Sequence, residues 1–252
     1  MAGRAHYSSS RPDTIKWFLI LGALVAVGLL GYLSLRHSHF FHKDVFLGER
    51  YPIRGIDVSK HNGVIDYNKV ADAGYSFVFV KATEGATFVD SNFYTNCRKA
   101  SDAGLIVGAY HFFRSNREGD VQAHNFIKAI KRVELDMPLV VDVEDWGNYN
   151  IVSEAEFNSR LRAMVKTLKQ EGYKVMIYTN GDGYRKYYKP NFEGEYLWLC
   201  KLSDPDSVTT AGHKFQQFSH WGRVAGIKGD VDLNVFMGSE REWDKWLDKV
   251  NE

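Results

Sequence analysis

The chain has few cysteines and almost no net charge. Its 252 residues include only Cys97 and Cys200, which make neither a disulfide framework nor a metal-binding signature. We expect two free thiols, with a single bridge as the alternative. A formal net charge of +1 argues against a nucleic-acid partner, because nucleic-acid binders usually show a strong basic excess. No Gly-x-Gly-x-x-Gly phosphate loop follows a strand-like segment, and we expect no cofactor.

One apolar run is long enough to cross a bilayer. Trp17 to Leu35 comprise 19 residues without a charge, near the ~20 residues that a spanning helix needs. No small-x-small cleavage site follows, so we expect an uncleaved signal-anchor, with a long cleaved signal peptide as the alternative. Residues 1–16 would then form a cytoplasmic tail, 17–35 the membrane span and 36–50 a juxtamembrane linker. Basic residues flank the run about equally on both sides, so charge leaves its orientation open.

Strand-like and helix-like segments alternate from Arg54 onward. Strands are expected at 54–59, 76–82, 105–113, 137–145 and 173–180, with helices at 66–74, 90–104, 119–133 and 153–172. Three later strands, at 195–202, 213–220 and 231–236, are separated mostly by loop, and a helix at 240–250 closes the chain. This alternation predicts a parallel sheet. About eight strands in roughly 200 residues predict an irregular β/α barrel, an α/β fold of about five β/α units followed by strands with few helices. An open doubly wound sheet is the alternative.

Polar and aromatic residues lie near the expected C-terminal ends of these strands, where parallel α/β folds gather functional groups. A single acid there is weak evidence, because Asp often caps the following helix. Inward-facing acids on three strands are harder to explain by capping. The candidate residues are Asp57, Lys81, Tyr110, Phe112, Asp142, Glu144, Tyr178, Trp198, Gln217 and Asp232.

Asp142 and Glu144 form the most informative pair. Two residues apart on a strand, they would share a face with their carboxyl groups ~6–7 Å apart. Paired carboxylates of this kind hydrolyse glycosidic bonds, and a carboxyl in an apolar site beside another one has the raised pKa of a general acid. The spacing lies between those of retaining and inverting enzymes, so the stereochemistry stays open. The alternatives are buried ion pairs with Lys81 or Arg114, and a Mg²⁺ or Ca²⁺ site.

The segments that carry these residues resemble the family 25 glycoside hydrolases, the lysozyme-type N-acetylmuramidases. The resemblance begins at "GIDVSKHNGVIDYNKVADAGYSFVFVKATEG", continues through "MPLVVDVED" and "VMIYTN", and ends at "GIKGDVDLNVFMG", covering residues ~51 to ~238. It implies a flattened β/α barrel as a single catalytic domain, 51–252. It also implies cleavage of the β-1,4 bond between N-acetylmuramic acid and N-acetylglucosamine in bacterial peptidoglycan.

The resemblance also implies roles for individual residues. Glu144 would be the proton donor and Asp142 its partner, with Asp57 and Asp232 as further acids of the cleft. Substrate-binding residues would be Tyr110, Phe112, Lys81, Tyr178, Trp198 and Gln217. The acids that match the motif are all present, so nothing indicates an inactive enzyme.

The chain departs from the family outside this core. It has neither repeats nor a wall-binding tail, and carries the apolar segment instead. We therefore expect a single-pass protein of the bacterial cytoplasmic membrane, with its catalytic domain outside the cytoplasm, that remodels peptidoglycan locally. A catalytically silent glycan-binding protein and a glycosidase acting on another N-acetylated glycan, such as chitin, are the alternatives. The sequence leaves the oligomeric state open.

Overall fold

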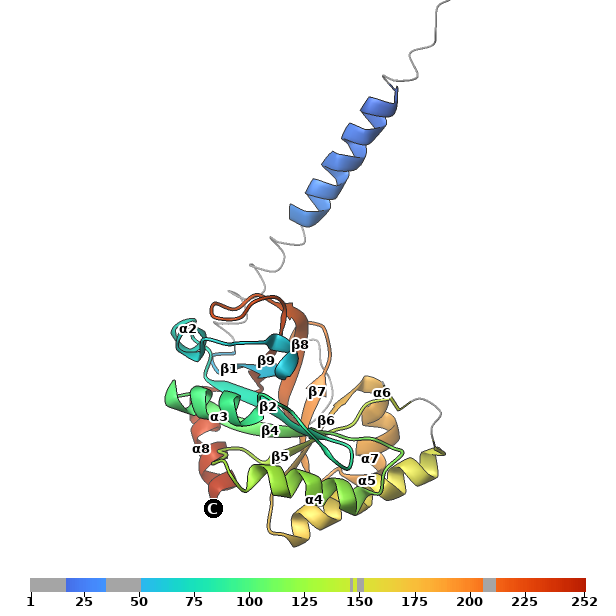
Figure 1. Cartoon of the computed structure of the whole chain (residues 1–252), viewed down its shortest axis with the longest axis vertical. Coiled ribbons are helices and arrows are strands. Elements are labelled where there is room, and N and C mark those ends of the chain that lie inside the picture. Colours follow the sequence, from blue (N-terminus) through green and yellow to red (C-terminus); the bar gives the residue numbers. More distant parts are fainter. Residues whose placement is uncertain (1–16, 35–50, 146, 149–151, 206–211) are drawn as a thin grey trace, which may run out of the picture. The chain divides into compact units, whose positions relative to one another are not determined.

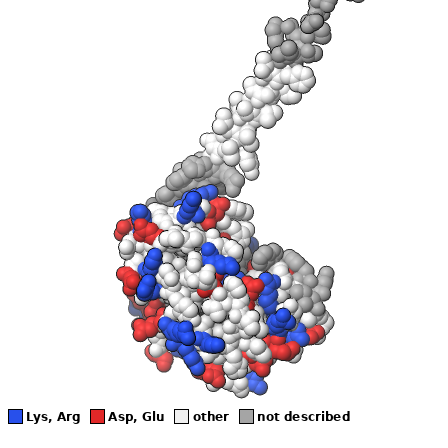
Figure 2. Space-filling view, viewed as in Figure 1, with Lys and Arg blue, Asp and Glu red and all other residues white. Residues whose placement is uncertain are grey.

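The computed structural model describes residues 17–34, 51–145, 147–148, 152–205 and 212–252. The chain divides into two units, Met1–Leu47 and Gly48–Glu252. In the first unit, Trp17–Ser34 form a helix of 18 residues with a mean hydropathy of 2.1, long and apolar enough to cross a membrane. No charged side chain interrupts it, as the white surface of this helix in Figure 2 shows. The expected tail, 1–16, and linker, 36–50, lie outside the described residues.

The second unit is built on a closed barrel of eight strands (Figure 1). Around the barrel the order is β1-β9-β8-β7-β6-β5-β4-β2, and pairing of β1 with β2 closes the ring. The strands are β1 (Arg54–Val58), β2 (Phe77–Glu84), β4 (Ile106–Phe112), β5 (Leu139–Asp142), β6 (Val175–Asn180), β7 (Tyr196–Cys200), β8 (His213–Gly222) and β9 (Val231–Phe236). A short strand, β3 (Phe88–Val89), pairs with the end of β2. The predicted irregular barrel is confirmed, and the open sheet is excluded.

Helices follow the first strands and lengthen up to α5, whereas the helical pieces after β6 are short. They are α2 (Tyr67–Asp72), α3 (Phe93–Asp102), α4 (Gly119–Ile130) and α5 (Glu154–Gln170), with a single turn, η1 (Lys60–Asn62), after β1. After β6 the chain forms a broken helical stretch of α6 (Gly181–Gly183), η2 (Tyr184–Tyr188) and α7 (Lys189–Asn191). The sequence predicted mostly loop there, because pieces this short show no helical periodicity.

The last strand of the barrel runs against the others. β9 is antiparallel to both β8 and β1, whereas the sequence predicted a fully parallel sheet. The chain between β8 and β9 is short, and antiparallel strands can be joined by a hairpin where parallel strands need a long crossover. Asp232 therefore lies at the start of β9 and not near its C-terminal end. The reversed direction still brings it to the functional end of the barrel, where it is paired in register with Asp57.

The strand that carries the acidic pair is shorter than expected. β5 covers Leu139–Asp142, whereas the sequence predicted a strand over 137–145, so Glu144 lies in the loop that follows. Two hydrogen bonds fix the backbone just beyond the strand. The Val143 N–H donates to the Tyr178 carbonyl at 2.9 Å, and the Thr179 hydroxyl donates to the Val143 carbonyl at 2.7 Å. The position of Glu144 therefore depends on loop contacts and not on the alternation of a strand.

The barrel is filled by large apolar side chains and closed by the last helix. Phe77, Phe79 and Phe215 contact one another edge to face inside it. Helix α8 (Glu240–Asn251) packs Trp243 and Trp246 against this aromatic core, with Trp243 5.6 Å from Phe77 between ring centroids. This end is opposite to the strand ends that carry the acids, so the core leaves the other mouth of the barrel open to solvent.

Both cysteines lie in the described part of the chain and are free, as predicted. Cys97 is buried in α3, and Cys200 ends β7 with partial exposure. Burial raises the pKa of the Cys97 thiol to about 12, so this thiol stays protonated at neutral pH.

Candidate active site

A cavity of about 590 Å³ opens at the C-terminal ends of the parallel strands. All ten residues predicted from the sequence line it: Asp57, Lys81, Tyr110, Phe112, Asp142, Glu144, Tyr178, Trp198, Gln217 and Asp232. Arg114, which the sequence analysis named only as a possible ion-pair partner of the acids, also lines it. Four further lining residues escaped the sequence reasoning: Ser59, His61, Glu84 and His220. Because neighbouring strands of the barrel all deliver residues to it, the cavity is a product of the fold and not of one loop.

Asp57 is one of the buried acids that line the cavity. Its Oδ2 accepts hydrogen bonds from the amides of Gln217 and Asn234, both at 2.8 Å. Burial raises its pKa well above the ordinary value, and the nearby Asp232 carboxylate raises it further. The two amides oppose this rise without reversing it. The Asp57 carboxyl is therefore held in a fixed orientation, and it binds its proton more tightly than a solvent-exposed Asp does.

Asp142 is 7% exposed and only partly satisfied. Its Oδ1 is buried and has no hydrogen-bond partner among the described residues. Burial is the first cause that raises its pKa, and the Glu144 carboxylate is the second. A buried acceptor without a donor carries a substantial cost in a folded protein. This oxygen is therefore suited to accept a hydrogen bond from an N–H or O–H group of the substrate.

Glu144 is half-buried in the loop after β5. Its own backbone carbonyl accepts a bond from the Asn148 side-chain amide at 3.0 Å, which helps to fix the loop. Burial raises the pKa of the carboxyl, the positive charge of His220 lowers it, and Asp232 raises it; the net shift is upward. A raised pKa keeps the proton on Glu144 nearer to neutral pH, as a general acid requires.

Asp145 points away from this group. Its carboxylate pairs with Lys186 at 2.7 Å and accepts a hydrogen bond from the Tyr187 hydroxyl, and it does not line the cavity. Partial burial acts to raise its pKa, but the bonds from Lys186 and Tyr187 outweigh burial and lower it. The loop is thereby anchored to the helical stretch after β6, and Glu144 is the acid left facing the cavity.

The aromatic residues form a hydrogen-bonded wall. The Tyr178 hydroxyl donates to Gln217 Oε1 at 2.7 Å, and the Trp198 indole N–H donates to Asn234 Oδ1 at 2.9 Å. The rings of Tyr178 and Trp198 contact edge to face, with 4.5 Å between centroids. Because Gln217 and Asn234 both donate hydrogen bonds to Asp57, the two aromatic residues and Asp57 belong to one hydrogen-bond network.

Lys81 and Arg114 do not form the ion pairs with Asp142 or Glu144 that the sequence left open. Both pair with Glu84, Lys81 Nζ at 2.7 Å and Arg114 Nη2 at 2.5 Å. Partial burial acts to raise the pKa of Glu84, but the hydrogen bonds from Lys81 and Arg114 outweigh it and lower the pKa. Arg114 also donates to the Gly147 carbonyl at 2.7 Å, which ties this cluster to the loop of Glu144.

His220 faces Asp232 across the opening. Its Nδ1 lies 2.6 Å from Asp232 Oδ1. This bond, followed by one to Cys200, raises the pKa of His220 to about 10, so the imidazole carries a charge at neutral pH. Among the described residues, no group of three or more His, Cys, Asp or Glu side chains is arranged to hold a metal ion.

Comparison with known proteins identifies the family. The model of the glycosyl hydrolases family 25 matches residues 56–227, which is well over half of the chain. The chain belongs to this family. The protein is therefore a glycoside hydrolase.

Known proteins are similar to this chain over most of its length. The uncharacterised protein YegX of Escherichia coli strain K12 is 36% identical over 214 residues, covering 80% of this chain and 76% of YegX. The autolytic lysozyme of Clostridium acetobutylicum is 31% identical over 73% of this chain and 56% of its own length. A solved family 25 structure from Bacillus anthracis superposes with a TM-score of 0.70 at 31% identity, covering 78% of this chain and 94% of that one.

Proposed function

We propose that this protein is an N-acetylmuramidase that cleaves the β-1,4 bond between N-acetylmuramic acid and N-acetylglucosamine in bacterial peptidoglycan. The observation that carries the proposal is the convergence of Asp57, Asp142, Glu144 and Asp232 on one cavity of a family 25 barrel. The lysozyme activity named for the Clostridium relative supports the substrate class. Glu144 and Asp142 have raised pKa values from burial, which is the environment that acid catalysis needs.

In this mechanism Glu144 donates its proton to the glycosidic oxygen as the bond breaks. The buried Oδ1 of Asp142, which lacks a partner among the described residues, accepts the N–H of the substrate's N-acetyl group. The acetamido carbonyl oxygen then attacks the anomeric carbon, and Asp142 stabilises the positive charge that develops on the ring that forms. Glu144, now deprotonated, takes a proton from water, which opens this intermediate from the face that the leaving group left, so the reaction retains the anomeric configuration.

The stereochemistry tests this mechanism. Proton NMR of the first-formed product should show retained configuration. Intact mass of enzyme treated with a fluorinated donor sugar should show no covalent adduct, because the nucleophile belongs to the substrate. An inverted product, or a labelled Asp142 peptide, would exclude substrate assistance.

We further propose that the helix Trp17–Ser34 is a signal-anchor in the bacterial cytoplasmic membrane and that the barrel lies outside the cytoplasm. The length and hydropathy of the helix support the anchor, and the extracytoplasmic position of peptidoglycan supports the orientation. A membrane-tethered enzyme reaches only nearby glycan. Local remodelling of the wall fits this arrangement better than release as a diffusible lytic agent.

The full-length chain in detergent should convert purified peptidoglycan into muropeptides with N-acetylmuramic acid at the reducing end, identified by mass after reduction. Chitin oligomers of the same length should be poor substrates. Turnover of chitin in preference to peptidoglycan would point to another N-acetylated glycan. If the protein binds peptidoglycan but does not cleave it, its function is that of a glycan-binding protein with the same fold.

A further inference from the structure

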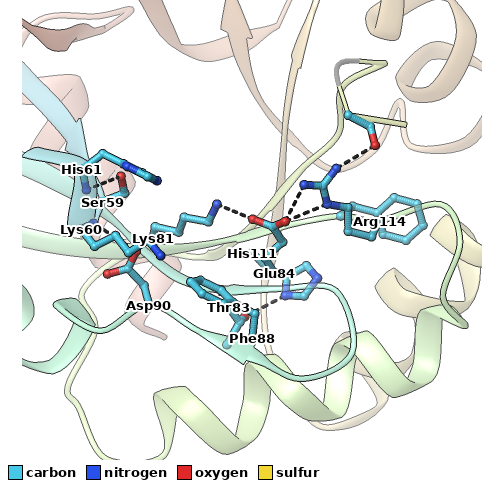
Figure 3. Close-up of polar contacts among 12 residues, drawn as sticks. Ser59, Lys60, His61, Lys81, Thr83, Glu84, Phe88, Asp90, His111 and Arg114 are labelled. Carbon is cyan, nitrogen blue, oxygen red and sulfur yellow. Dashed lines mark hydrogen bonds and ion pairs between the residues drawn. The ribbon is translucent and has the colours of Figure 1, made fainter. Parts of the chain in front are cut away.

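A second cavity of about 450 Å³ adjoins the catalytic one. The two cavities share His61, Lys81, Glu84 and Arg114 as lining residues, so they form adjacent parts of one groove. Figure 3 shows this boundary, with Lys81 and Arg114 approaching Glu84 from opposite sides. The rest of the lining is Lys60, Gly85, Ala86, Thr87, Phe88, Asp90, Asn116, Arg117 and Gly147. The second cavity contains none of the four acids proposed for catalysis.

The balance of acidic and basic lining residues differs between the two cavities. The catalytic cavity is lined by five acids against two Lys or Arg side chains. The second cavity is lined by four Lys or Arg side chains against two acids. The excess of Lys and Arg side chains makes the second cavity the part of the groove that attracts an anionic group on a bound glycan.

Neither acid of the second cavity can neutralise its remaining cations. Both oxygens of Glu84 are occupied, one by Lys81 and the other by Arg114. Asp90 is 2% exposed, and its two oxygens accept the backbone N–H groups of Lys60 and Asn92 at 3.0 and 2.9 Å. Glu84 and Asp90 thus already have hydrogen-bond partners that fix the shape of the groove. The other cations of the second cavity therefore give it a local excess of positive charge.

Lys60 and Arg117 carry that excess. Both side chains are exposed, and neither has an acidic partner among the described residues. Lys60 Nζ lies 4.8 Å from the centre of the Phe88 ring, which holds the ammonium over the cavity. Two unpaired cations beside an aromatic face suit a carboxylate that is attached to a partly apolar chain.

We propose that this second cavity, the stem pocket, binds a free carboxylate of the peptide stem that branches from the muramic acid of the substrate. The inference rests on the proposed muramidase function, because the stem can reach the pocket only if its sugar lies in the catalytic cavity. Lys60 and Arg117 contact the carboxylate, and Phe88 contacts the apolar part of the stem. The enzyme then selects glycan that still carries charged stems over glycan whose stems are removed or neutralised.

The test compares three soluble substrates of the full-length chain in detergent. They are glycan strands with intact stems, the same strands after chemical amidation of the stem carboxylates, and strands freed of stems by an amidase. The variant is Lys60→Gln/Arg117→Gln. Its kcat/KM on intact strands should fall about 2- to 30-fold, the range for losing two exposed ion pairs. Its loss on amidated and stem-free strands should be clearly smaller, and high salt should reduce the difference.

The matched control is Lys128→Gln/Lys166→Gln, which removes two exposed charges from α4 and α5 outside both cavities. It should keep the activity of the natural chain on all three substrates. If Lys60→Gln/Arg117→Gln lowers kcat/KM equally on intact and on amidated strands, the proposal is overturned. An equal loss on stem-free strands, whose remaining carboxylate is that of the lactyl group, would also overturn it.

A binding measurement keeps this test separate from the proposed function. Fluorescence anisotropy of a labelled, stem-bearing glycan fragment compares the natural chain with the same two variants, and it needs no turnover. If the natural chain cleaves none of the strands, the muramidase proposal fails, and weaker binding by Lys60→Gln/Arg117→Gln alone still supports a stem pocket. If the natural chain cleaves its substrates and the variants bind equally, the stem pocket fails and the muramidase stands.

Discussion

Glu144 is subject to opposing influences at the mouth of the barrel. Burial and Asp232 raise its pKa, whereas the imidazolium of His220 lowers it. A general acid works only while protonated, so the rate falls as pH rises through the pKa of Glu144. Replacing His220 with Gln removes the one charge that lowers this pKa and leaves Asp232 without its cation. We therefore expect the alkaline limb of the kcat/KM profile to move to higher pH.

Profiles of the natural chain and of His220→Gln, measured on the same soluble glycan, check this expectation. His124→Gln is the matched control, because His124 is exposed on α4 and does not line the cavity. A limb that stays in place, or moves to lower pH, would mean that His220 does not act on Glu144 through its charge.

His111 should make the stability of the barrel depend on pH. It is fully buried between Thr83 and Gln122, and burial lowers its pKa to about 4. The unfolded chain binds a proton at this residue below pH 6.5, and the folded chain does so only below about 4. Stability is therefore full above pH 6.5 and falls as the pH decreases towards 4, by about 3 kcal/mol.

Denaturant unfolding at several pH values measures this loss. The natural chain should lose stability over the window from pH 6.5 to 4, and His111→Gln should lose markedly less there, although it is less stable overall. Parallel curves for the two chains would assign the pH dependence to other groups.

The individual site residues were predictable to different degrees. Asp142 and Glu144 follow an apolar strand in sequence, so their burial and partnership could be predicted from a local pattern. Glu84, Arg114 and His220 could not, because their roles depend on which strand ends are neighbours around the barrel. The role of Glu84 depends on its ion pairs with Lys81 and Arg114, which come from two different strand ends.

Helix α8 is the element that closes the barrel opposite the active site. Trp243 is 5% exposed and lies 5.1 Å from Phe236 and 5.6 Å from Phe77 between ring centroids. Truncating a large buried aromatic residue removes its packing and leaves a cavity. We expect Trp243→Ala to lower the free energy of unfolding by about 3–5 kcal/mol.

Trp221→Ala serves as the control for this experiment, because Trp221 is 51% exposed. It should change stability by only about 0.5 kcal/mol. Similar losses in the two variants, measured by chemical denaturation, would show that α8 does not close the core.

Among helices and strands, the periodicity of apolar residues predicted the long helices. It did not predict features that depend on tertiary contacts. α5 could be predicted from its apolar spacing and from the cap at Ser153, whose side chain accepts the N–H of Glu156 at 3.2 Å. The direction of β9 could not, since the letters "VDLNVF" are compatible with either direction. Its antiparallel course follows from the short connection to β8 and from the gap that closure of the barrel leaves beside β1.

For the whole molecule, we propose that the apolar helix determines where the enzyme acts. We expect Trp17–Ser34 to remain in the mature protein and residues 51–252 to lie outside the cytoplasm. Membrane fractionation followed by protease treatment of intact spheroplasts tests both points. A soluble mature form that begins after Leu35 would rule out the anchor. Protection of the barrel in intact spheroplasts, with digestion only after lysis, would rule out the orientation.

The central claim is that Glu144 donates the proton that cleaves the muramic acid bond, and one paired measurement tests it most directly. Glu144→Gln and the natural chain are compared on peptidoglycan strands and on an aryl glycoside whose leaving group needs no proton. The account predicts a loss of ~10²–10⁴-fold on peptidoglycan, with muropeptide formation followed by mass, and a far smaller loss on the aryl glycoside. An equal loss on both substrates, or an active variant on peptidoglycan, would contradict it.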